Sequence, residues 1–424
     1  MSHPRIAIAG AGPAGLTLAR ILHLAGIPFT IYELDPSKEH RYEQGGRFLF
    51  IFFRYFSLLE ADNLARIGGS LDLHQESGLA AMEAANLTPE LSKILRPEGE
   101  ATCITDHTST VLYYDCADSE SGKGTRPEVD RTQLRTLLLE SIPQDAIKWG
   151  HKVKEAKQGA DRTYTLTFED RPEASGFDIL IGCDGAWSKI RPLVSETKPH
   201  YSGVSAVEVR HRNVSNRNPT LSSLVGPGTL FSLHDSKNIC GQRNGDDSIR
   251  IYAAQLTDES WVSTCGIDWT NSRKAMEELK DRYYGDWDKK LQDSIAKADE
   301  DTLLPRAMYM LPVGFSWPQR NGVTVIGDAA HLMTPFAGEG VNLAMWDAML
   351  LGQALAGALK DGWNGARVWK AMRLFEEEMF TRAGGKAQET WDNLQMFFQP
   401  GAAKKVADMF KMMMAQGGPP GPPQ

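Results

Sequence analysis

The sequence predicts an α/β protein in which a parallel sheet covered by helices is joined to a second domain with an antiparallel sheet. Two observations lead to this fold class. Apolar strands alternate with helical segments near both ends of the chain, and glycine-rich turns follow three of these strands. Between them, residues 192–310 carry strands, at 204–211, 229–234 and 248–255, with partial polar and apolar alternation, which is typical of an antiparallel sheet with one covered face.

The first strand and turn lie at the N-terminus. Residues 5–9 have a buried-strand pattern, residues 10–15 read Gly-Ala-Gly-Pro-Ala-Gly, and residues 16–25 have a helical pattern. A second strand over residues 28–32 ends at Glu33, which is 18 residues after the last glycine. This Rossmann-like order predicts a domain that binds an ADP-containing dinucleotide. The competing interpretation is a glycine-rich turn in another kind of α/β unit.

Each residue type in this motif has a physical reason. Gly10 permits the tight turn, Gly12 lets a pyrophosphate approach the backbone, and Gly15 lets the helix pack on the strand. Glu33 would bind ribose hydroxyl groups. The motif by itself does not separate FAD from NAD.

Two later motifs imply the same kind of ligand. The strand over residues 177–182 leads into Cys183-Asp184-Gly185, and the strand over residues 323–326 leads into Gly327 and Asp328. An acid after a strand, followed by glycines and a helix start, indicates a ligand site in an open α/β sheet. The alternative is an ordinary strand–loop–helix connection.

Bulk properties exclude several classes of protein. The 424 residues are 42% hydrophobic and 24% charged, as in soluble globular proteins of two or more domains. A net charge of −8 argues against nonspecific nucleic-acid binding. The five cysteines show no paired spacing, which favours reduced thiols, a cytoplasmic location and no metal site. We expect no signal peptide and no membrane-spanning segment.

The pattern along the chain also predicts domain boundaries. We expect a discontinuous nucleotide-binding domain (1–191 and 311–360), a substrate domain (192–310), a C-terminal helical region (361–415) and a disordered tail (416–424). Helices are predicted at about 76–85 and at 272–284, 287–297, 343–359, 365–396 and 404–414. In the substrate domain, Glu208, Arg210 and Arg250 either line a pocket or belong to solvated faces.

Several polar positions outside the motifs have two interpretations. His74, close to Asp72, is better explained as a hydrogen-bonding residue at a helix start than as a catalytic group. Asp130 is predicted to cap a helix that runs to residue 141. Arg131 and Arg135 share one face of this helix, so one of them either reaches the cofactor or the two form a solvated pair.

Taken together, the motifs resemble those of the class A flavoprotein aromatic hydroxylases. The three stretches are GAGPAGL at 10–16, GCDGAWSKIRP at 182–192 and GDAAHLMTPFAGEGVNLAMWDA at 327–348. The stretch GGSLDLHQESGLAAMEAANL at 68–87 looks nearest to the tetracycline-inactivating flavin monooxygenases of secondary metabolism. The resemblance covers roughly residues 4 to 400.

The resemblance implies a para-hydroxybenzoate hydroxylase-like fold with a long C-terminal helix and bound FAD. Asp328 would contact the ribityl chain, and the turn from Pro335 to Asn342 would lie against the isoalloxazine ring. The implied FAD-binding residues are Gly10, Gly12, Pro13, Ala14, Gly15, Glu33, Asp72, Arg131, Asp184, Gly185, Gly327, Asp328, Pro335, Gly338, Gly340, Val341 and Asn342. Candidates for the substrate pocket are Glu208, Arg250 and Phe336.

The family's chemistry would then apply. NADPH or NADH reduces FAD, and O2 converts the reduced flavin into a C4a-hydroperoxide. One oxygen atom passes to an electron-rich aromatic or polyketide-like substrate, and the other leaves as water. No general base is assignable from the sequence, and we expect a monomer.

The chain departs from the family pattern at residues 47–69. Removal of this phenylalanine-rich block would restore the family spacing between Gly46 and Ser70. The block is either foreign to the functional fold, as a translated retained intron would be, or a genuine lid or membrane-touching insertion. The arginine on the NADPH side is therefore either Arg41 or Arg66.

Two rival functions remain open at this stage. The block could leave a catalytically disabled flavoprotein-like chain, or the scaffold could carry an oxidase or a halogenase. The tryptophan signature of related halogenases is absent. A smaller departure is Leu34, where many relatives have an arginine, and this change weakens one contact to the adenosine half.

Overall fold

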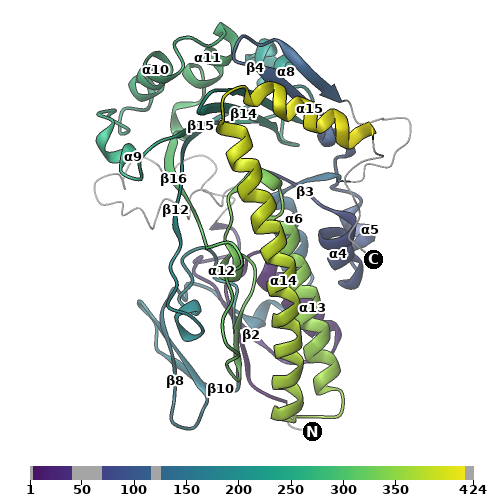
Figure 1. Cartoon of the computed structure of the whole chain (residues 1–424). Coiled ribbons are helices and arrows are strands. Elements are labelled where there is room, and N and C mark those ends of the chain that lie inside the picture. The colour runs from purple at the N-terminus through teal and green to yellow at the C-terminus, as the bar shows by residue number, and fades with distance from the viewer. Residues whose placement is uncertain (1–2, 41–68, 116–125, 416–424) are drawn as a thin grey trace.

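The computed structural model describes residues 3–40, 69–115 and 126–415. The expectations for Arg41, for Arg66, for the 47–69 block apart from Gly69, and for the tail after residue 415 fall outside these ranges. Two long helices, α13 (Gly340–Leu359) and α14 (Gly365–Phe398), run side by side along the molecule (Figure 1).

A five-stranded parallel sheet forms the first layer, in the order β17-β11-β1-β2-β7. Every residue of β1 and β11 is buried, because a parallel sheet is covered on both faces and its central strands are apolar throughout. The strands are β1 (Ile6–Ala9), β2 (Thr30–Tyr32), β7 (Ile147–Lys148), β11 (Ile179–Gly182) and β17 (Val323–Val325).

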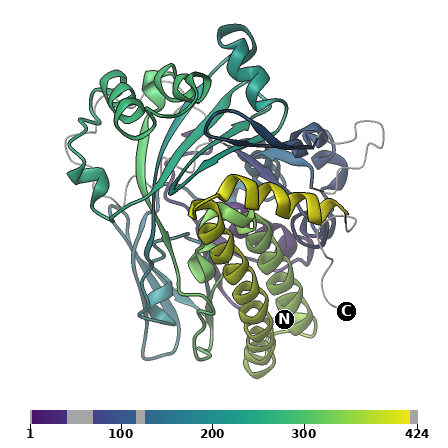
Figure 2. The same ribbon diagram turned by 45° about the horizontal axis from the view of Figure 1, so that its top comes forward.

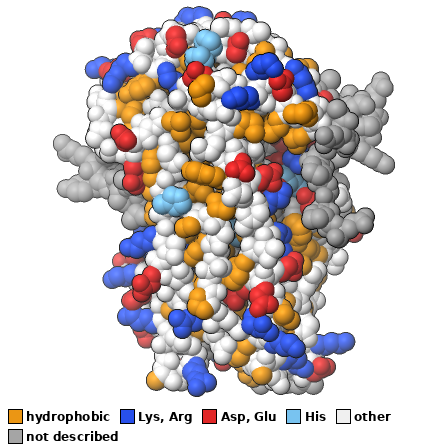
Figure 3. Space-filling view, in the orientation of Figure 1, with side chains coloured by type: hydrophobic (Ala, Val, Ile, Leu, Met, Phe, Trp, Pro, Cys, Tyr) orange, Lys and Arg blue, Asp and Glu red, His pale blue; other side chains and the backbone are white. Residues whose placement is uncertain are grey.

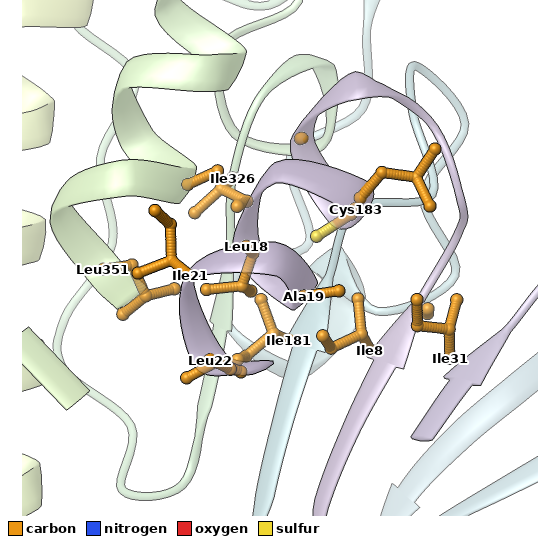
Figure 4. Close-up of a cluster of buried hydrophobic side chains, with 14 of the residues drawn as sticks. Ile8, Leu18, Ala19, Ile21, Leu22, Ile31, Ile181, Cys183, Ile326 and Leu351 are labelled. Carbon is orange, nitrogen blue, oxygen red and sulfur yellow. The ribbon is translucent and has the colours of Figure 1, made fainter. Parts of the chain in front are cut away.

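Helix α1 (Pro13–Leu24) covers one face of this sheet and packs against α13. Figure 4 shows Leu18 and Ile21 of α1 between the sheet and Leu351 of α13. Helix α6 (Arg131–Glu140) packs against α1 as well. This core therefore fixes the position of α1, whose first turn follows the glycine motif.

The second layer is a seven-stranded sheet in the order β16-β12-β15-β14-β13-β4-β5. Its pairs are antiparallel, as predicted, except for the parallel pair of β13 with β4. The strands are β4 (Thr102–Asp106), β5 (Val111–Asp115), β12 (His200–His211), β13 (Thr229–His234), β14 (Lys237–Arg243), β15 (Ile249–Leu256) and β16 (Leu304–Met310). Strands β4 and β5 pair within this large sheet, although their residues were predicted to lie in the nucleotide-binding domain. The predicted domain boundaries stay a prediction.

Helices cover both faces of the large sheet. Helices α8 (Pro219–Val225), α10 (Ser272–Tyr283) and α11 (Lys289–Ala296) pack on one face, and the end of α14 and α15 (Ala402–Ala415) pack on the other. Figure 2 shows α15 crossing this second face. The shorter helices are α4 (Ala80–Ala84), α5 (Thr88–Leu91), α7 (Val214–Arg217), α9 (Trp261–Thr264) and α12 (Asp328–His331).

Two small sheets complete the fold. Strands β8 (Val153–Gln158), β9 (Tyr164–Phe168) and β10 (Ala174–Phe177) form one, and β3 (Ser70–Asp72) pairs with β6 (Glu128–Asp130) in the other. After β3 the chain makes a π-helical turn, Gln75–Leu79, before α4. The sequence predicted one continuous helix here.

Asp130 stands at the N-cap position of α6, as predicted, but its side chain does not cap the helix. The carboxylate makes no hydrogen bond to the first turn of α6. Its carboxylate accepts hydrogen bonds from the Gly245 N–H (3.1 and 3.2 Å) and lies 3.6 Å from the Arg96 guanidinium. Because these partners are distant in sequence, Asp130 connects β6 to the turn after β14 instead.

The surface carries charges of both signs. Figure 3 shows basic and acidic side chains interspersed on one face of the molecule. Among the described residues, no group of three or more potential ligands is placed to hold a metal ion. None of the helices that the structure describes has both the length and the apolar character needed to cross a bilayer.

Candidate functional site

The three sequence motifs meet at one edge of the parallel sheet. They follow β1, β11 and β17, which are neighbouring parallel strands, so their carboxyl ends lie side by side. Gly10 packs directly on the second motif, because a Cβ atom at Gly10 would lie 2.5 Å from the Cys183 carbonyl oxygen. The φ angle of +100° at Gly10 also requires glycine. The guanidinium of Arg191 ties the second motif to the third through the Ala329 carbonyl (3.1 Å).

The glycine-rich loop leaves room beside the start of α1. A Cβ atom at Gly12 would meet nothing within 4 Å, whereas one at Gly15 would lie 2.1 Å from the Gly10 carbonyl oxygen. No side chain caps α1, and Pro13, followed by Ala14, stands at its first position. The free N–H groups of an uncapped helix start favour an anion such as a pyrophosphate. Open space and positive potential therefore coincide at Gly12.

Glu33 supports this loop from inside. Its buried carboxylate accepts hydrogen bonds from the Ala11 N–H (2.5 Å) and the Asp35 N–H (3.1 Å). Arg135 reaches the same loop, with its Nε 3.3 Å from the Ala11 carbonyl oxygen and its Nη2 3.0 Å from Asp35 Oδ2. Of the two arginines predicted to share a helix face, Arg135 is therefore the one that braces the glycine loop. The backbone N–H of Arg131 donates to the Gly69 carbonyl oxygen (2.9 Å), and the contact of Arg131 with a cofactor stays a prediction.

The two remaining motif acids are used differently. The Asp184 carboxylate accepts hydrogen bonds from the Ser188 hydroxyl and the Lys189 N–H (both 2.6 Å), so it shapes its own loop beside Gly185. Asp328, at the start of α12, is exposed. Of these two acids, Asp328 is therefore the one open to a ligand.

A buried ionic cluster holds the turn that precedes Asp328. The fully buried Asp347 carboxylate accepts a hydrogen bond from the Gly327 N–H (3.1 Å), and it pairs with His331 (2.5 Å) and Arg382 (2.9 Å). Burial raises the pKa of Asp347, but the two cationic partners outweigh this effect and hold it below its usual value. This cluster joins α12, α13 and α14 behind the predicted ribityl contact.

The turn before α13 offers a second open helix start. Pro335 is exposed, Gly338 has a φ angle of +68°, and a Cβ atom at Gly340 would meet nothing within 4 Å. No side chain caps α13, so its dipole favours negative charge next to Gly340 and the half-buried Val341.

Asn342 fixes this turn against β3. Its buried amide oxygen accepts a hydrogen bond from the His74 N–H (2.9 Å), and its amide nitrogen donates to the Asp72 carbonyl (2.9 Å). A Cβ atom at Gly338 would lie 3.2 Å from the Asp72 carboxylate, so this carboxylate borders the turn. The contact of Asn342 with a flavin ring stays a prediction, because its side chain is engaged within the protein.

One face of the large sheet points toward the same turn. Glu208, Tyr252, Cys240 and Phe231 lie directly opposite one another on successive strands, so they share a face. Phe231 packs against Phe397 (ring centroids 5.5 Å apart).

Phe336 joins the aromatic contacts on this face. Its ring centroid lies 5.6 Å from that of Phe397 and 5.5 Å from that of Phe398, both at the end of α14. The three substrate candidates from the sequence, Glu208, Arg250 and Phe336, therefore lie on or against this face. Arg250 shares it with Tyr252 because side chains two residues apart on a strand point the same way.

The charged candidates on this face pair with each other. Glu208 and Arg250 are buried and form an ion pair, and Arg306 lies 3.4 Å from the second Glu208 oxygen. Tyr252 is half-buried, and burial together with the Glu208 charge raises its pKa to about 12. Substrate contact by Glu208 and Arg250 stays a prediction, and Tyr252 is the more accessible polar group.

Comparisons with known proteins decide the family. A family model described as an FAD binding domain matches residues 146–368, more than half of the chain. The monooxygenase asqM of Emericella nidulans is 30% identical over 97% of this chain and 98% of its own length. The chain belongs to the FAD-dependent monooxygenases.

Solved structures agree with this fold. HpxO of Klebsiella pneumoniae, complexed with FAD and uric acid, matches with a TM-score of 0.72 at 20% identity, covering 97% of this chain and 93% of HpxO. The tetracycline destructase Tet(51) matches with a TM-score of 0.65 at 16% identity, covering 98% and 96%. The predicted family is therefore confirmed by the family model and the asqM relative, and the predicted fold class by the solved structures, of which Tet(51) is one.

The residues of this monooxygenase fit FAD. Space at Gly12 and Gly340, two uncapped helix starts and the exposed carboxylate of Asp328 are features that suit the phosphates, the ring and the hydroxyl groups of FAD. The sequence missed two supporting sets of contacts, those of Asp347 with His331 and Arg382, and those of the buried Glu339 with His74 (3.5 Å) and Lys386 (2.5 Å). Their partners lie in other parts of the chain, so no local motif signals them.

Proposed function

We propose that this monooxygenase binds FAD across the carboxyl ends of β1, β11 and β17 and oxygenates an aromatic or polyketide-like small molecule. The observation that carries the proposal is the convergence of three motifs, separated by more than a hundred residues in sequence, on neighbouring strands. Open α/β sheets bind ligands at this edge. NADPH or NADH is the proposed electron donor, and O2 is the proposed oxidant.

When bound, FAD supplies the redox chemistry, accepting a hydride from the nicotinamide and activating O2 at its C4a atom. The protein supplies position and field. The start of α1 would stabilise the pyrophosphate, and Asp328 would hold the ribityl hydroxyl groups. The start of α13 would stabilise negative charge on the ring.

The proposed substrate lies between the turn at Phe336 and the face of the large sheet that carries Tyr252 and Phe231. Phe231, Met308 and Phe336 are half-buried apolar side chains on this side, and they suit a flat, apolar molecule. Tyr252 and Arg306 add hydrogen-bond donors to this face. An aromatic or conjugated carbon skeleton with a polar substituent matches both features.

Absorption spectroscopy of the purified chain tests the cofactor. We expect flavin bands that bleach on anaerobic addition of NADPH or NADH and return in air. Product analysis by mass spectrometry, with ¹⁸O2 and a panel of phenols and polyketide aromatics, then tests oxygen transfer. A chain that stays colourless after incubation with FAD would exclude the proposed cycle.

A further inference from the structure

A chain of four charged side chains leads from the predicted flavin turn to the surface of α14. The Nε2 atom of His74 lies 2.8 Å from Asp72 Oδ2, and its Nδ1 atom lies 3.5 Å from Glu339 Oε2. The other oxygen of Glu339 lies 2.5 Å from the ammonium group of Lys386. The four groups therefore form a continuous path from β3 to α14.

The path is buried in the middle and open at both ends. The side chains of His74 and Glu339 are 2% and 4% exposed, whereas those of Asp72 and Lys386 are 34% and 30% exposed. The Asp72 end borders Gly338, in the turn predicted to contact the flavin. The Lys386 end faces solvent from α14, where it also contacts Glu389 (3.1 Å). Such a path can exchange protons between solvent and a closed site.

His74 is placed to carry a proton on each ring nitrogen, because each faces a carboxylate. Burial lowers the pKa of His74, but the contacts with Asp72 and Glu339 outweigh burial and raise it to about 9, against the opposing charge of Arg126. Burial raises the pKa of Glu339, but His74 and Lys386 reverse this and hold it low. The buried section is therefore an ion pair in which the 3.5 Å contact of His74 Nδ1 with Glu339 is the longest link, and this contact must shorten for a proton to pass.

We propose that these four side chains form a proton relay between solvent and the flavin, an inference that rests on the function proposed above. The overall reaction NAD(P)H + H⁺ + O2 + R–H → NAD(P)⁺ + R–OH + H2O takes up one proton in each turnover. The hydride and the substrate each contribute two electrons, and O2 accepts all four. The proton ends in the product water, so it must enter a site from which bulk water is kept out.

Each member of the relay has one role. Protonated His74 gives its Nε2 proton to Asp72 and is left neutral, with its remaining proton on Nδ1. A flip of the imidazole ring then turns the proton-free nitrogen toward Glu339, from which it takes up the next proton. Lys386 resupplies Glu339 and is itself reprotonated by solvent. Asp72 delivers the proton at the turn beside Gly338, and Asn342 keeps His74 and Asp72 in register because it binds the backbone of both.

Stopped-flow reoxidation of the FAD-loaded chain tests the relay without the unknown substrate. The flavin is reduced with dithionite and then mixed with O2, so the assay does not depend on nicotinamide binding. Reoxidation of an anionic reduced flavin with release of H2O2 takes up one proton. We expect Glu339→Gln and Lys386→Gln to slow reoxidation roughly tenfold or more, and to change its pH profile and solvent isotope effect. We expect FAD affinity to change less than about threefold.

Matched controls separate proton transfer from loss of structure. His211→Gln removes another buried histidine, bonded to the Ser294 carbonyl (2.8 Å), and Lys404→Gln removes another helical lysine paired with an acid, Asp408. Neither control should change the pH profile. In His74→Ala, added imidazole should restore part of the rate, which a purely structural role does not predict.

Two outcomes would overturn the relay. The first is reoxidation in Glu339→Gln and Lys386→Gln with the wild-type rate and pH profile. The second is a slowing that follows lost FAD affinity alone and is not rescued by imidazole. Failure of NADPH and NADH to reduce the wild-type flavin would instead count against the proposed function, and the dithionite assay would still decide the relay.

Discussion

The close packing of α1 on α13 can be tested with two glycines of the same helix. A Cβ atom at Gly352 would lie 2.6 Å from Ile21 Cγ2 and 2.9 Å from Ile21 Cβ, whereas one at Gly357 would meet nothing within 4 Å. Packed carbon atoms sit about 3.5–4 Å apart, so Gly352→Ala must push the two helices apart by roughly 1 Å. Such overpacking costs about 1–3 kcal/mol, and alanine returns at most about 1 kcal/mol of helix propensity.

We therefore expect Gly352→Ala to lower the free energy of unfolding by about 1–2 kcal/mol. Gly357→Ala, which gains the propensity without the clash, should raise it by up to about 1 kcal/mol. Urea denaturation of both variants, followed by far-UV circular dichroism, measures the difference. FAD affinity should fall in Gly352→Ala alone, because the start of α1 carries the glycine motif. Equal stability of the two variants would refute the close approach of the helices.

Three further predictions concern buried charge. Asp347→Asn removes the anion between His331 and Arg382, and it should lower the free energy of unfolding by about 3–5 kcal/mol in urea denaturation, whereas the exposed Asp408→Asn should change it by less than about 0.5 kcal/mol. The pKa of His74 rises from 6.5 to about 9 on folding. Protonation of His74 therefore adds roughly 3 kcal/mol to the free energy of unfolding. This contribution is complete below about pH 6.5 and is lost as the pH rises through about 9. Urea denaturation of the FAD-free chain between about pH 6.5 and 9 should show that the free energy of unfolding falls as the pH rises. His74→Gln should abolish this fall, and an unchanged pH dependence in the variant would contradict the raised pKa of His74. Glu33→Gln should weaken FAD binding about tenfold or more in fluorescence titration, and wild-type affinity would exclude a role of its carboxylate in shaping the loop.

The sequence predicts those features of the site that depend on local chemistry. Gly15 is dictated by its close approach to the Gly10 carbonyl oxygen within one strand–turn–helix unit, and such units have a recognisable spacing. The strand Thr229–His234 and the helix Ser272–Tyr283 also lie within a residue of their predicted bounds, because strongly patterned segments fold as their pattern indicates.

Features that depend on distant partners could not be predicted in the same way. Glu339 belongs to the third motif, yet its buried partner His74 comes 265 residues earlier. Asp130 has the sequence of a helix cap but bonds to Gly245, because the large sheet brings that turn to β6. Such pairings form only when separate sheets and helices pack together in the folded chain. The type of a side chain does not predict its partner, because an aspartate or glutamate can bond to many different groups.

The motif acids show how this limit affects the reading of function. Glu33, Asp184 and Asp328 all follow a strand of the parallel sheet, and the sequence predicts a cofactor contact for each. In the structure, Glu33 accepts the Ala11 N–H of the glycine loop, Asp184 accepts the Lys189 N–H of its own loop, and only the third of these acids is exposed. A carboxylate that satisfies loop N–H groups fixes the shape of the backbone that surrounds the ligand. Acids at equivalent places in three motifs therefore differ in their surroundings. Two are held within the protein and shape loops, and the exposed one, Asp328, is open to a ligand.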